Sequence, residues 1–427
     1  MNGYLDMELL RFTTAGSVDD GKSTLIGRLL YDSKSIFEDQ MKAVVRASER
    51  LGNKEINLAL LTDGLRAERE QGITIDVAYR YFSTPKRKFI IADTPGHIEY
   101  TRNMVTGAST ADVAIILVDA RHGIMEQTRR HSYIASLLGL EAVVVAINKM
   151  DLMDFSQNTF ECIKNEYAAI ANKLNLKNVY YIPMSAYYGD NVVHPSERMP
   201  WYEGDTLLGL LEKMPVKEGL VDLPMRLPIQ YVIRPQEEKF HDYRAYAGRL
   251  ASGKIKVGDQ VTILPSLTQS TVKAIDQAGI SLAEASAPLS VAICLEDDVD
   301  VSRGCMLVKS DELPLIDTEF SLLVCWLNPR PMAVGNKYII RHTTDEMYGL
   351  VKEVEYKVNI KTLDNRTNDK VVRMNDLAQI RIKTAVPVKY DLYSQNRVTG
   401  SLVIIDATTF ETVGAGMIVG VESNNNV

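Results

Sequence analysis

The chain has 427 residues, of which 46% are apolar and 24% are charged, and this balance excludes a largely disordered, collagen-like or coiled-coil chain. At roughly 100 to 200 residues per domain, the length predicts two to four domains. The 48 Lys and Arg residues against 55 Asp and Glu residues give a net charge of −7, which argues against a protein that coats nucleic acid or anionic lipid.

The N-terminal segment MNGYLDMELLRF has no basic stretch followed by an apolar core, so we expect no secretory signal. No uncharged apolar run reaches the ~18 residues that span a bilayer. We therefore expect a cytoplasmic protein with no membrane partner. The cysteines form no C-x-x-C pair and have no histidine at zinc-ligand spacing, which predicts reduced and mostly buried thiols at Cys162, Cys294, Cys305 and Cys325.

The first half of the chain alternates short apolar runs with longer helical stretches, the pattern of a parallel sheet covered by helices. Near-continuous apolar runs predict buried strands over Lys88–Asp93, Asp112–Ala120, Ala142–Asn148 and Asn178–Ala186. We expect the last helix over Thr206–Met214. The proline-containing stretch that follows predicts a linker. We therefore expect a first domain over residues 1–219.

Beyond this linker, short strands separated by turn residues predict all-β barrels or sandwiches. Alternating or β-branched segments cover Arg226–Pro235, Arg249–Pro265 and Leu350–Asn359. A polar stretch around Pro314 predicts a second boundary. We therefore expect two β domains, over residues 220–312 and 313–427.

The segment Gly16–Ser23, GSVDDGKS, matches the phosphate-binding loop G-x-x-x-x-G-K-[ST]. It stands between a strand-like and a helical segment, as such a loop must. Backbone N–H groups there can surround phosphate oxygens, Lys22 supplies a cation, and the Ser23 hydroxyl can bind Mg²⁺. The bare pattern is weak, because Gly248–Ile255 nearly matches it. In that second segment Ile255 replaces the hydroxyl, and the alternation predicts a strand.

Three further clusters follow predicted strands in the order expected of one nucleotide pocket. Asp93–His97, DTPGH, supplies an aspartate that can hold Mg²⁺ through water and a glycine N–H that can reach a γ-phosphate. Asn148–Asp151, NKMD, ends in a carboxylate that can accept two hydrogen bonds from guanine, and adenine offers no such donor pair. Ser185 and Ala186 follow the next strand, where a backbone N–H could meet guanine O6.

We therefore expect one pocket that binds GTP and Mg²⁺. Its candidate binding residues are Gly16, Ser17, Val18, Asp19, Asp20, Gly21, Lys22, Ser23, Thr24, Asp93, Thr94, Pro95, Gly96, His97, Asn148, Lys149, Met150, Asp151, Ser185 and Ala186.

This ordered set resembles the translation-factor class of GTP-binding proteins over essentially the whole chain. The resemblance implies an α/β P-loop GTPase domain with a mostly parallel sheet, followed by two all-β barrel domains. In that class a threonine of a G-I-T-I segment closes over Mg²⁺ and the γ-phosphate, and Gly72–Ile75 matches this segment. The resemblance thus adds Thr74 to Ser23 and Asp93 as candidate metal ligands.

The same resemblance implies the catalytic residues. His97 aligns with the histidine that orients the attacking water, and Val18 and Ile73 match the apolar pair that gates it. Lys22 and Thr74 complete the candidate catalytic set, because charge that develops on the phosphates is neutralised by Lys22 and by the Mg²⁺ that Ser23 and Thr74 would hold.

At finer detail the chain is similar to the large, GTP-hydrolysing subunits of bacterial sulfate adenylyltransferases. Long stretches carry this likeness: Gly16–Gln40, Tyr79–Thr110 and Asp119–Leu140. A departure is the pair Ile98 and Glu99, where many relatives are expected to have Glu-Gln. The resemblance implies a heterodimer, or a larger assembly, with a smaller subunit that binds ATP and sulfate and forms adenosine 5′-phosphosulfate. GTP hydrolysis would then drive that synthesis through two conformational states, with no nucleic-acid partner.

Two other functions fit the same frame. An elongation factor that delivers aminoacyl-tRNA tends to carry an arginine in the last strand pair, whereas Ser401–Gly416 has Asp406 in that region. A GTP-regulated scaffold without catalytic coupling is the third option. Sequence alone leaves both open.

Overall fold

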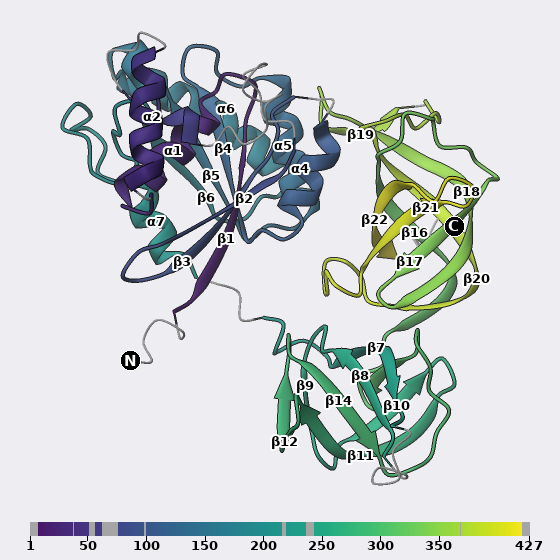
Figure 1. Cartoon of the computed structure of the whole chain (residues 1–427). Coiled ribbons are helices and arrows are strands. Elements are labelled where there is room, and N and C mark those ends of the chain that lie inside the picture. Colours follow the sequence, from purple (N-terminus) through teal and green to yellow (C-terminus); the bar gives the residue numbers. More distant parts are fainter. Residues whose placement is uncertain are drawn as a thin grey trace. The chain divides into compact units, whose positions relative to one another are not determined.

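The computed structural model describes residues 7–36, 38–50, 56–61, 76–97, 100–215, 219–235, 243–367 and 369–420, and Figure 1 draws the whole chain. The chain divides into two compact units. One comprises Met1–Lys217 with Asn359–Asp364, and the other comprises Glu218–Val358 with Asn365–Val427. In the described ranges, no helix is long and apolar enough to cross a membrane. All four cysteines are free; two are buried, Cys305 is half-buried and Cys162 is exposed.

The first unit contains a six-stranded sheet in the order β2-β3-β1-β4-β5-β6. Its strands are β1 (Leu9–Ala15), β2 (Ala78–Ser83), β3 (Lys88–Asp93), β4 (Val113–Asp119), β5 (Ala142–Asn148) and β6 (Val179–Pro183). Five of them are parallel, and β2 pairs antiparallel with β3 at the edge. Two strand predictions, Lys88–Asp93 and Ala142–Asn148, are confirmed at both ends. The other two extend past the observed strands, because their terminal residues already belong to loops.

Helices connect these strands, as the alternating pattern predicts. They are α1 (Lys22–Asp32), α2 (Glu38–Arg50), α4 (Thr101–Ala108), α5 (Glu126–Leu137), α6 (Gln157–Lys173) and α7 (Leu207–Lys213), with short 3₁₀ helices η1 (Leu58–Leu61) and η3 (Met150–Met153). Every residue of β4 and β5 is buried, as expected when helices cover both faces of a parallel sheet. The predicted helix Thr206–Met214 is α7 plus its two caps, and the Thr206 hydroxyl accepts the Gly209 N–H at 3.2 Å.

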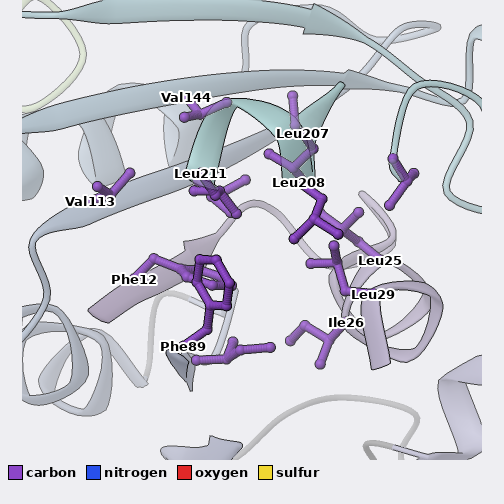
Figure 2. Close-up of a cluster of buried hydrophobic side chains, with 14 of the residues drawn as sticks. Phe12, Leu25, Ile26, Leu29, Phe89, Val113, Val144, Leu207, Leu208 and Leu211 are labelled. Atoms are coloured by element: carbon purple, nitrogen blue, oxygen red, sulfur yellow. The ribbon is translucent and has the colours of Figure 1, made fainter. Parts of the chain in front are cut away.

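The helix after the first loop is anchored by an apolar core (Figure 2). Leu25 and Leu29 of α1 are fully buried and pack with Leu207 and Leu211 of α7 against one face of the sheet. Burial of a leucine side chain contributes about 1.5–3 kcal/mol. This packing holds the N-terminal end of α1 at the end of β1, where the phosphate-binding motif lies.

In the described part of the second unit, every regular element is a β-strand. One sheet has the order β10-β15-β7-β8-β14-β11-β12, and a further β10–β11 pairing closes six of its strands into a barrel. Its strands, with the separate pair β9 and β13, are β7 (Arg226–Ile233), β8 (Ala245–Arg249), β9 (Lys254–Lys256), β10 (Gln260–Leu264), β11 (Thr268–Gln277), β12 (Ile280–Leu282), β13 (Glu284–Ser286), β14 (Ser290–Leu295) and β15 (Met306–Lys309). Lys254 and Ile255 of the near-matching second motif lie in β9, so the prediction of a strand there is confirmed.

The other sheet has the order β17-β21-β22-β16-β20-β18-β19 and is closed by a β17–β18 pairing. Its strands are β16 (Leu315–Trp326), β17 (Lys337–His342), β18 (Asp345–Asn359), β19 (Asp364–Thr367), β20 (Leu377–Tyr390), β21 (Ser401–Asp406) and β22 (Thr412–Gly420). The expected architecture, an α/β domain followed by two all-β barrels, is therefore confirmed. The domain limits at residues 219 and 312 stay predictions.

Buried ionic contacts join the two barrels within the second unit. Arg226 of β7 is 2% exposed and makes two hydrogen bonds to the Asp391 carboxylate, at 3.0 and 2.9 Å. Lys389 of β20 donates to the Gly304 carbonyl at 3.0 Å and pairs with Asp345 at 2.6 Å. Because each charge is paired, the desolvation that burial imposes is offset by direct contacts.

Candidate functional site

The predicted site lies along one edge of the parallel sheet. Each cluster lies at the carboxyl end of a strand: Gly16–Ser23 follows β1, Asp93–His97 begins at the end of β3, and Asn148–Asp151 begins at the end of β5. Ser185 and Ala186 follow β6. The carboxyl ends of parallel strands meet at the same edge of a sheet, which is where open α/β sheets bind ligands. The structure therefore brings together the four clusters that the sequence singled out.

The first loop turns tightly into α1. Gly21 has φ 95°, in the left-handed region that favours glycine, and Asp19 has φ 70°. A Cβ at Gly21 would also lie 2.5 Å from Asn148 Nδ2. Glycine is thus required at this position both by backbone conformation and by the close approach of the loop after β5.

Lys22 is a buried cation with neutral partners. Its side chain is 8% exposed, and its ammonium donates to the carbonyl oxygens of Gly16 and Ser17, both at 3.0 Å. Burial lowers the pKa of Lys22, while the charges of Asp93 and Asp20 act in the opposite direction. Among the described residues, no carboxylate lies within ion-pair distance of this ammonium. A buried ammonium of this kind favours an anionic ligand, because buried charges need opposite charge.

The loop after β3 lies directly against the first loop. Asp93 is 2% exposed, and the neighbouring Thr94 hydroxyl donates to the Thr14 carbonyl at 2.6 Å. A Cβ at Gly96 would lie 2.5 Å from Lys22 Nζ, so this backbone approaches the lysine as closely as a glycine allows. His97 is half-buried, and its ring centroid lies 6.0 Å from that of Tyr100.

Asn148 connects three loops. This side chain is 2% exposed; its Nδ2 donates to the Asp20 carbonyl at 2.8 Å, and its Oδ1 accepts the Ala186 N–H at 2.9 Å. The loops after β1, β5 and β6 are therefore held together by one amide. Sequence reasoning placed Asn148 among the binding residues, and the structure shows it in addition as the bridge between them.

Asp151 carries an unmet hydrogen-bond acceptor. Its Oδ1 is buried and has no hydrogen-bond partner among the described residues. A buried acceptor without a donor costs about 1–3 kcal/mol, so the arrangement favours a ligand that supplies N–H groups at this point. The site thus offers a cation at Lys22 for an anion and a carboxylate at Asp151 for a donor.

The other candidates lie in or beside the same loops. Val18 is 37% exposed, and the Ser17 hydroxyl is buried without a partner among the described residues. Half-buried or buried candidates from all four clusters are Ser23, Thr24, Pro95, Lys149, Met150, Ser185 and Ala186. Thr74 and Ile73 lie outside the described residues.

Sequence reasoning missed one buried carboxylate at this edge. Asp119 ends β4, is 2% exposed, and contacts both Arg121 and Lys149. The available signal was its position at the end of a predicted strand, β4, which lies between β1 and β5, the strands that carry two of the four motifs. It belongs to none of the four nucleotide-binding clusters, so the motif matches gave it no role.

The family models of known proteins match both units of the chain. The model described as elongation factor Tu GTP binding domain matches residues 7–265, and a model described as GTP-eEF1A C-terminal domain-like matches residues 319–419. Among solved structures, Sup35 complexed with GDP is similar, with a TM-score of 0.44 and 23% identity over 98% of this chain and 95% of that chain. A score this low carries no argument about function.

Curated relatives match along nearly the whole chain. It is 50% identical to sulfate adenylyltransferase subunit 1 of Sulfurovum sp. (strain NBC37-1), over 99% of this chain and 90% of that protein. It is 51% identical to the protein of the same name from Cellvibrio japonicus, over 98% and 89%. The bifunctional enzyme CysN/CysC of Mycobacterium tuberculosis (strain ATCC 25618 / H37Rv) is 50% identical over 96% of this chain and 67% of that enzyme.

Proposed function

The chain belongs to the sulfate adenylyltransferase subunit 1 family of GTPases, with a GTP-binding domain of the elongation factor Tu type, and from this premise we propose that it couples GTP hydrolysis to sulfate activation. In this proposal a partner catalytic subunit forms adenosine 5′-phosphosulfate from ATP and sulfate. The phosphate–sulfate anhydride is a high-energy bond, so its synthesis needs an external source of free energy.

One observation carries the nucleotide part of the proposal. Among the described residues, the buried Lys22 ammonium donates only to neutral acceptors and the buried Asp151 Oδ1 has no donor, and Asn148 links the two loops. A guanine nucleotide would supply phosphate oxygens at the first position and N–H donors at the second. The family match to a GTP-binding domain supports the same ligand.

The chain also offers oxygen ligands for Mg²⁺. In our proposal the Ser23 hydroxyl and the buried Asp93 carboxylate hold the ion, and Thr74, outside the described residues, is the third candidate. Mg²⁺ in nucleotide sites is usually held by one or two protein oxygens together with phosphate and water oxygens. When bound, Mg²⁺ neutralises charge on the β and γ phosphates.

For hydrolysis we assign His97 to orient a water molecule in line with the γ-phosphate. It is half-buried and adjacent to Gly96, whose backbone contacts the Lys22 end of the site. Lys22 stabilises the charge that develops on the phosphate oxygens.

His97→Ala tests this assignment. GTP affinity is expected to stay close to that of the wild type, and partner-stimulated turnover to fall by about 10²-fold or more. His194→Ala, at an exposed histidine outside the four clusters, is the matched control. Unchanged stimulated turnover in His97→Ala would remove His97 from the role.

The proposal also includes a partner subunit. The relatives named subunit 1 are about 50% identical to this chain, and the match spans most of the length of each relative. A subunit requires at least one partner chain. We infer a smaller ATP-binding subunit, in a heterodimer or larger assembly, located in the cytoplasm. Coupling requires that the partner binds the GTP and GDP forms with different affinity.

One experiment tests the coupling. GTP turnover is measured with the partner subunit, with and without ATP and sulfate, and in parallel on ribosomes with aminoacyl-tRNA. We expect stimulation by the partner that increases when both substrates are present. Stimulation by ribosomes alone would instead support the elongation-factor alternative. The last strand pair does not favour that alternative: Asp406 accepts the N–H groups of Thr408 and Thr409, at 2.8 and 2.9 Å, as a turn residue.

A further inference from the structure

A buried ionic cluster lies beside the guanine-specifying loop. Asp119 ends β4 and is 2% exposed, and β4 and β5 pair so that Asp119 stands opposite Asn148. The Ala120 N–H also donates to the Asn148 carbonyl at 2.9 Å. Asp119 is therefore fixed next to the Asn148–Asp151 loop, yet it belongs to none of the four motifs.

Two cations hold the Asp119 carboxylate. Arg121 makes three contacts: Nε to Oδ1 at 3.0 Å, Nη2 to Oδ2 at 2.6 Å and the backbone N–H to Oδ1 at 2.9 Å. Lys149 Nζ pairs with Oδ2 at 2.9 Å. Burial raises the pKa of Asp119, but the hydrogen bonds from Arg121 and Lys149 outweigh burial and hold the pKa below its ordinary value. The carboxylate is thus ionised at neutral pH.

The second contact of Lys149 reaches the phosphate-binding loop. Lys149 Nζ also donates to the carbonyl oxygen of Asp19. The Lys149 backbone has φ 62°, so the side chain starts from a left-handed residue at the turn after β5. One ammonium therefore spans the end of β4 and the first loop, and its only ionic partner among the described residues is Asp119.

Two adjacent residues of the Asn148–Asp151 loop thus both connect that loop to the phosphate-binding loop. Asn148 bonds the Asp20 carbonyl, and Lys149 bonds the Asp19 carbonyl. The first loop is the candidate phosphate end of the site, and Asp151 is the candidate base end. A nucleotide that spans both ends needs a fixed separation between them, and fixing it before binding reduces the entropy that binding must supply.

We propose that Asp119 is a positioning residue for the guanine nucleotide: it holds Lys149 between the base loop and the phosphate-binding loop, and Arg121 fixes the orientation of its carboxylate. The inference rests on the proposed binding of GTP. Asp119 itself contacts no nucleotide and acts through Lys149. Without the Asp119 charge, Lys149 keeps only the neutral Asp19 carbonyl as a partner among the described residues, so its ammonium is held less firmly between the two loops.

The test is a double-mutant cycle on the full chain, with a fluorescent GDP analogue as the probe and GTP as the competitor. Asp119→Asn, which keeps the shape and removes the charge, is expected to weaken nucleotide binding by about 10-fold and to accelerate dissociation. In a Lys149→Met background the same change is expected to alter affinity by less than about 2-fold. The effect should fall on KM for GTP rather than on kcat.

Two outcomes would overturn the inference. One is an Asp119→Asn chain that binds the analogue as tightly as the wild type. The other is a full-size effect in the Lys149→Met background, because Asp119 would then act by another route. A wild-type chain that binds no guanine nucleotide would instead overturn the proposed function, so the two failures are distinguishable.

Further variants separate positioning from stability. Asp119→Glu keeps the charge and is expected to recover part of the affinity, whereas a merely structural defect would not be rescued. Arg121→Gln leaves the Lys149 pair in place and is expected to weaken binding by about 3-fold, which keeps the test available if Asp119→Asn does not fold. Asp205→Asn is the matched control, because it removes an exposed ion pair with Lys213. It is expected to leave affinity unchanged.

Discussion

Two buried cations, one in each unit, differ in what surrounds them. Lys22 in the α/β unit is 8% exposed and donates to two neutral carbonyl oxygens. Arg226 in the barrel unit is 2% exposed and makes two hydrogen bonds to the Asp391 carboxylate. A buried cation in direct contact with a carboxylate holds structure together, whereas a buried cation that contacts only neutral acceptors among the described residues is stabilised further when an anion binds. The comparison predicts opposite effects of removing each charge.

Lys22→Ala should produce the largest effect on nucleotide binding and should leave folding nearly unchanged. Loss of charged hydrogen bonds to two phosphates is expected to weaken GTP binding by about 10²-fold or more, measured by calorimetric titration. The melting temperature of the nucleotide-free chain should stay the same or rise, because the charge that is removed is buried and makes no direct ion pair with the described residues. Lys213→Ala, at an exposed lysine, is the control. A large drop in the melting temperature of Lys22→Ala would contradict the comparison.

Arg226→Met should act in the opposite way. It leaves Asp391 buried without its cation and is expected to reduce the free energy of unfolding of the barrels by about 3–5 kcal/mol. Urea unfolding followed by Trp326 fluorescence measures this loss, in a Trp201→Phe background that leaves one tryptophan. Combining Arg226→Met with Asp391→Leu should recover part of it. We expect the GTP affinity of Arg226→Met to stay within about 2-fold of that of the wild type. A loss of binding comparable to that of Lys22→Ala would contradict the assignment of different roles to the two cations.

Asp151→Asn sharpens the comparison at the base end of the site. The amide offers a donor where the carboxylate only accepts, so the preference should move from guanine to xanthine, with discrimination changed by roughly 10²-fold. Competition between GTP and XTP measures it. Asp154→Asn makes the same substitution three residues away, at an exposed residue with φ 50° that asparagine tolerates. If Asp151→Asn still prefers GTP, the interpretation of the unmet oxygen is wrong.

His131 gives the smallest predicted effect, on the pH dependence of stability. It lies in α5, is 3% exposed, and burial together with the charges of Lys22 and Arg130 lowers its pKa to about 3. The unfolded chain binds a proton below its ordinary pKa of 6.5 while the folded chain does not, so stability is lost as pH falls through 6.5. At pH 5.5 the loss is about 1.4 kcal/mol relative to pH 7.5.

Equilibrium unfolding at the two pH values measures this dependence. His131→Gln should remove the loss of stability between pH 7.5 and pH 5.5 that His131 causes, whereas His194→Gln, at an exposed histidine, should leave it unchanged. An unchanged pH dependence in His131→Gln would show that another group titrates.

Alternation alone predicted all-β domains but not their closure into barrels, which the family resemblance implied. Alternation in Arg226–Pro235 and Leu350–Asn359 correctly indicated strands, because side chains alternate between the faces of any strand. Closure depends on the pairing of β10 with β11 and of β17 with β18, together with the order of the strands between them. Alternation is the same whichever strand lies alongside, so it carries no information about partners.

The sequence by itself determined where the four clusters of the candidate site stand, because each follows a strand-like run and the carboxyl ends of parallel strands must share an edge. Only the tertiary structure decided which polar groups meet there. Asn148 bonds the Asp20 carbonyl across 128 positions of the chain, Arg226 meets Asp391 across 165, and Asp119 acquires Lys149 as a partner. Such pairings depend on distances of a few ångströms between segments far apart in sequence, which local patterns of residues do not contain.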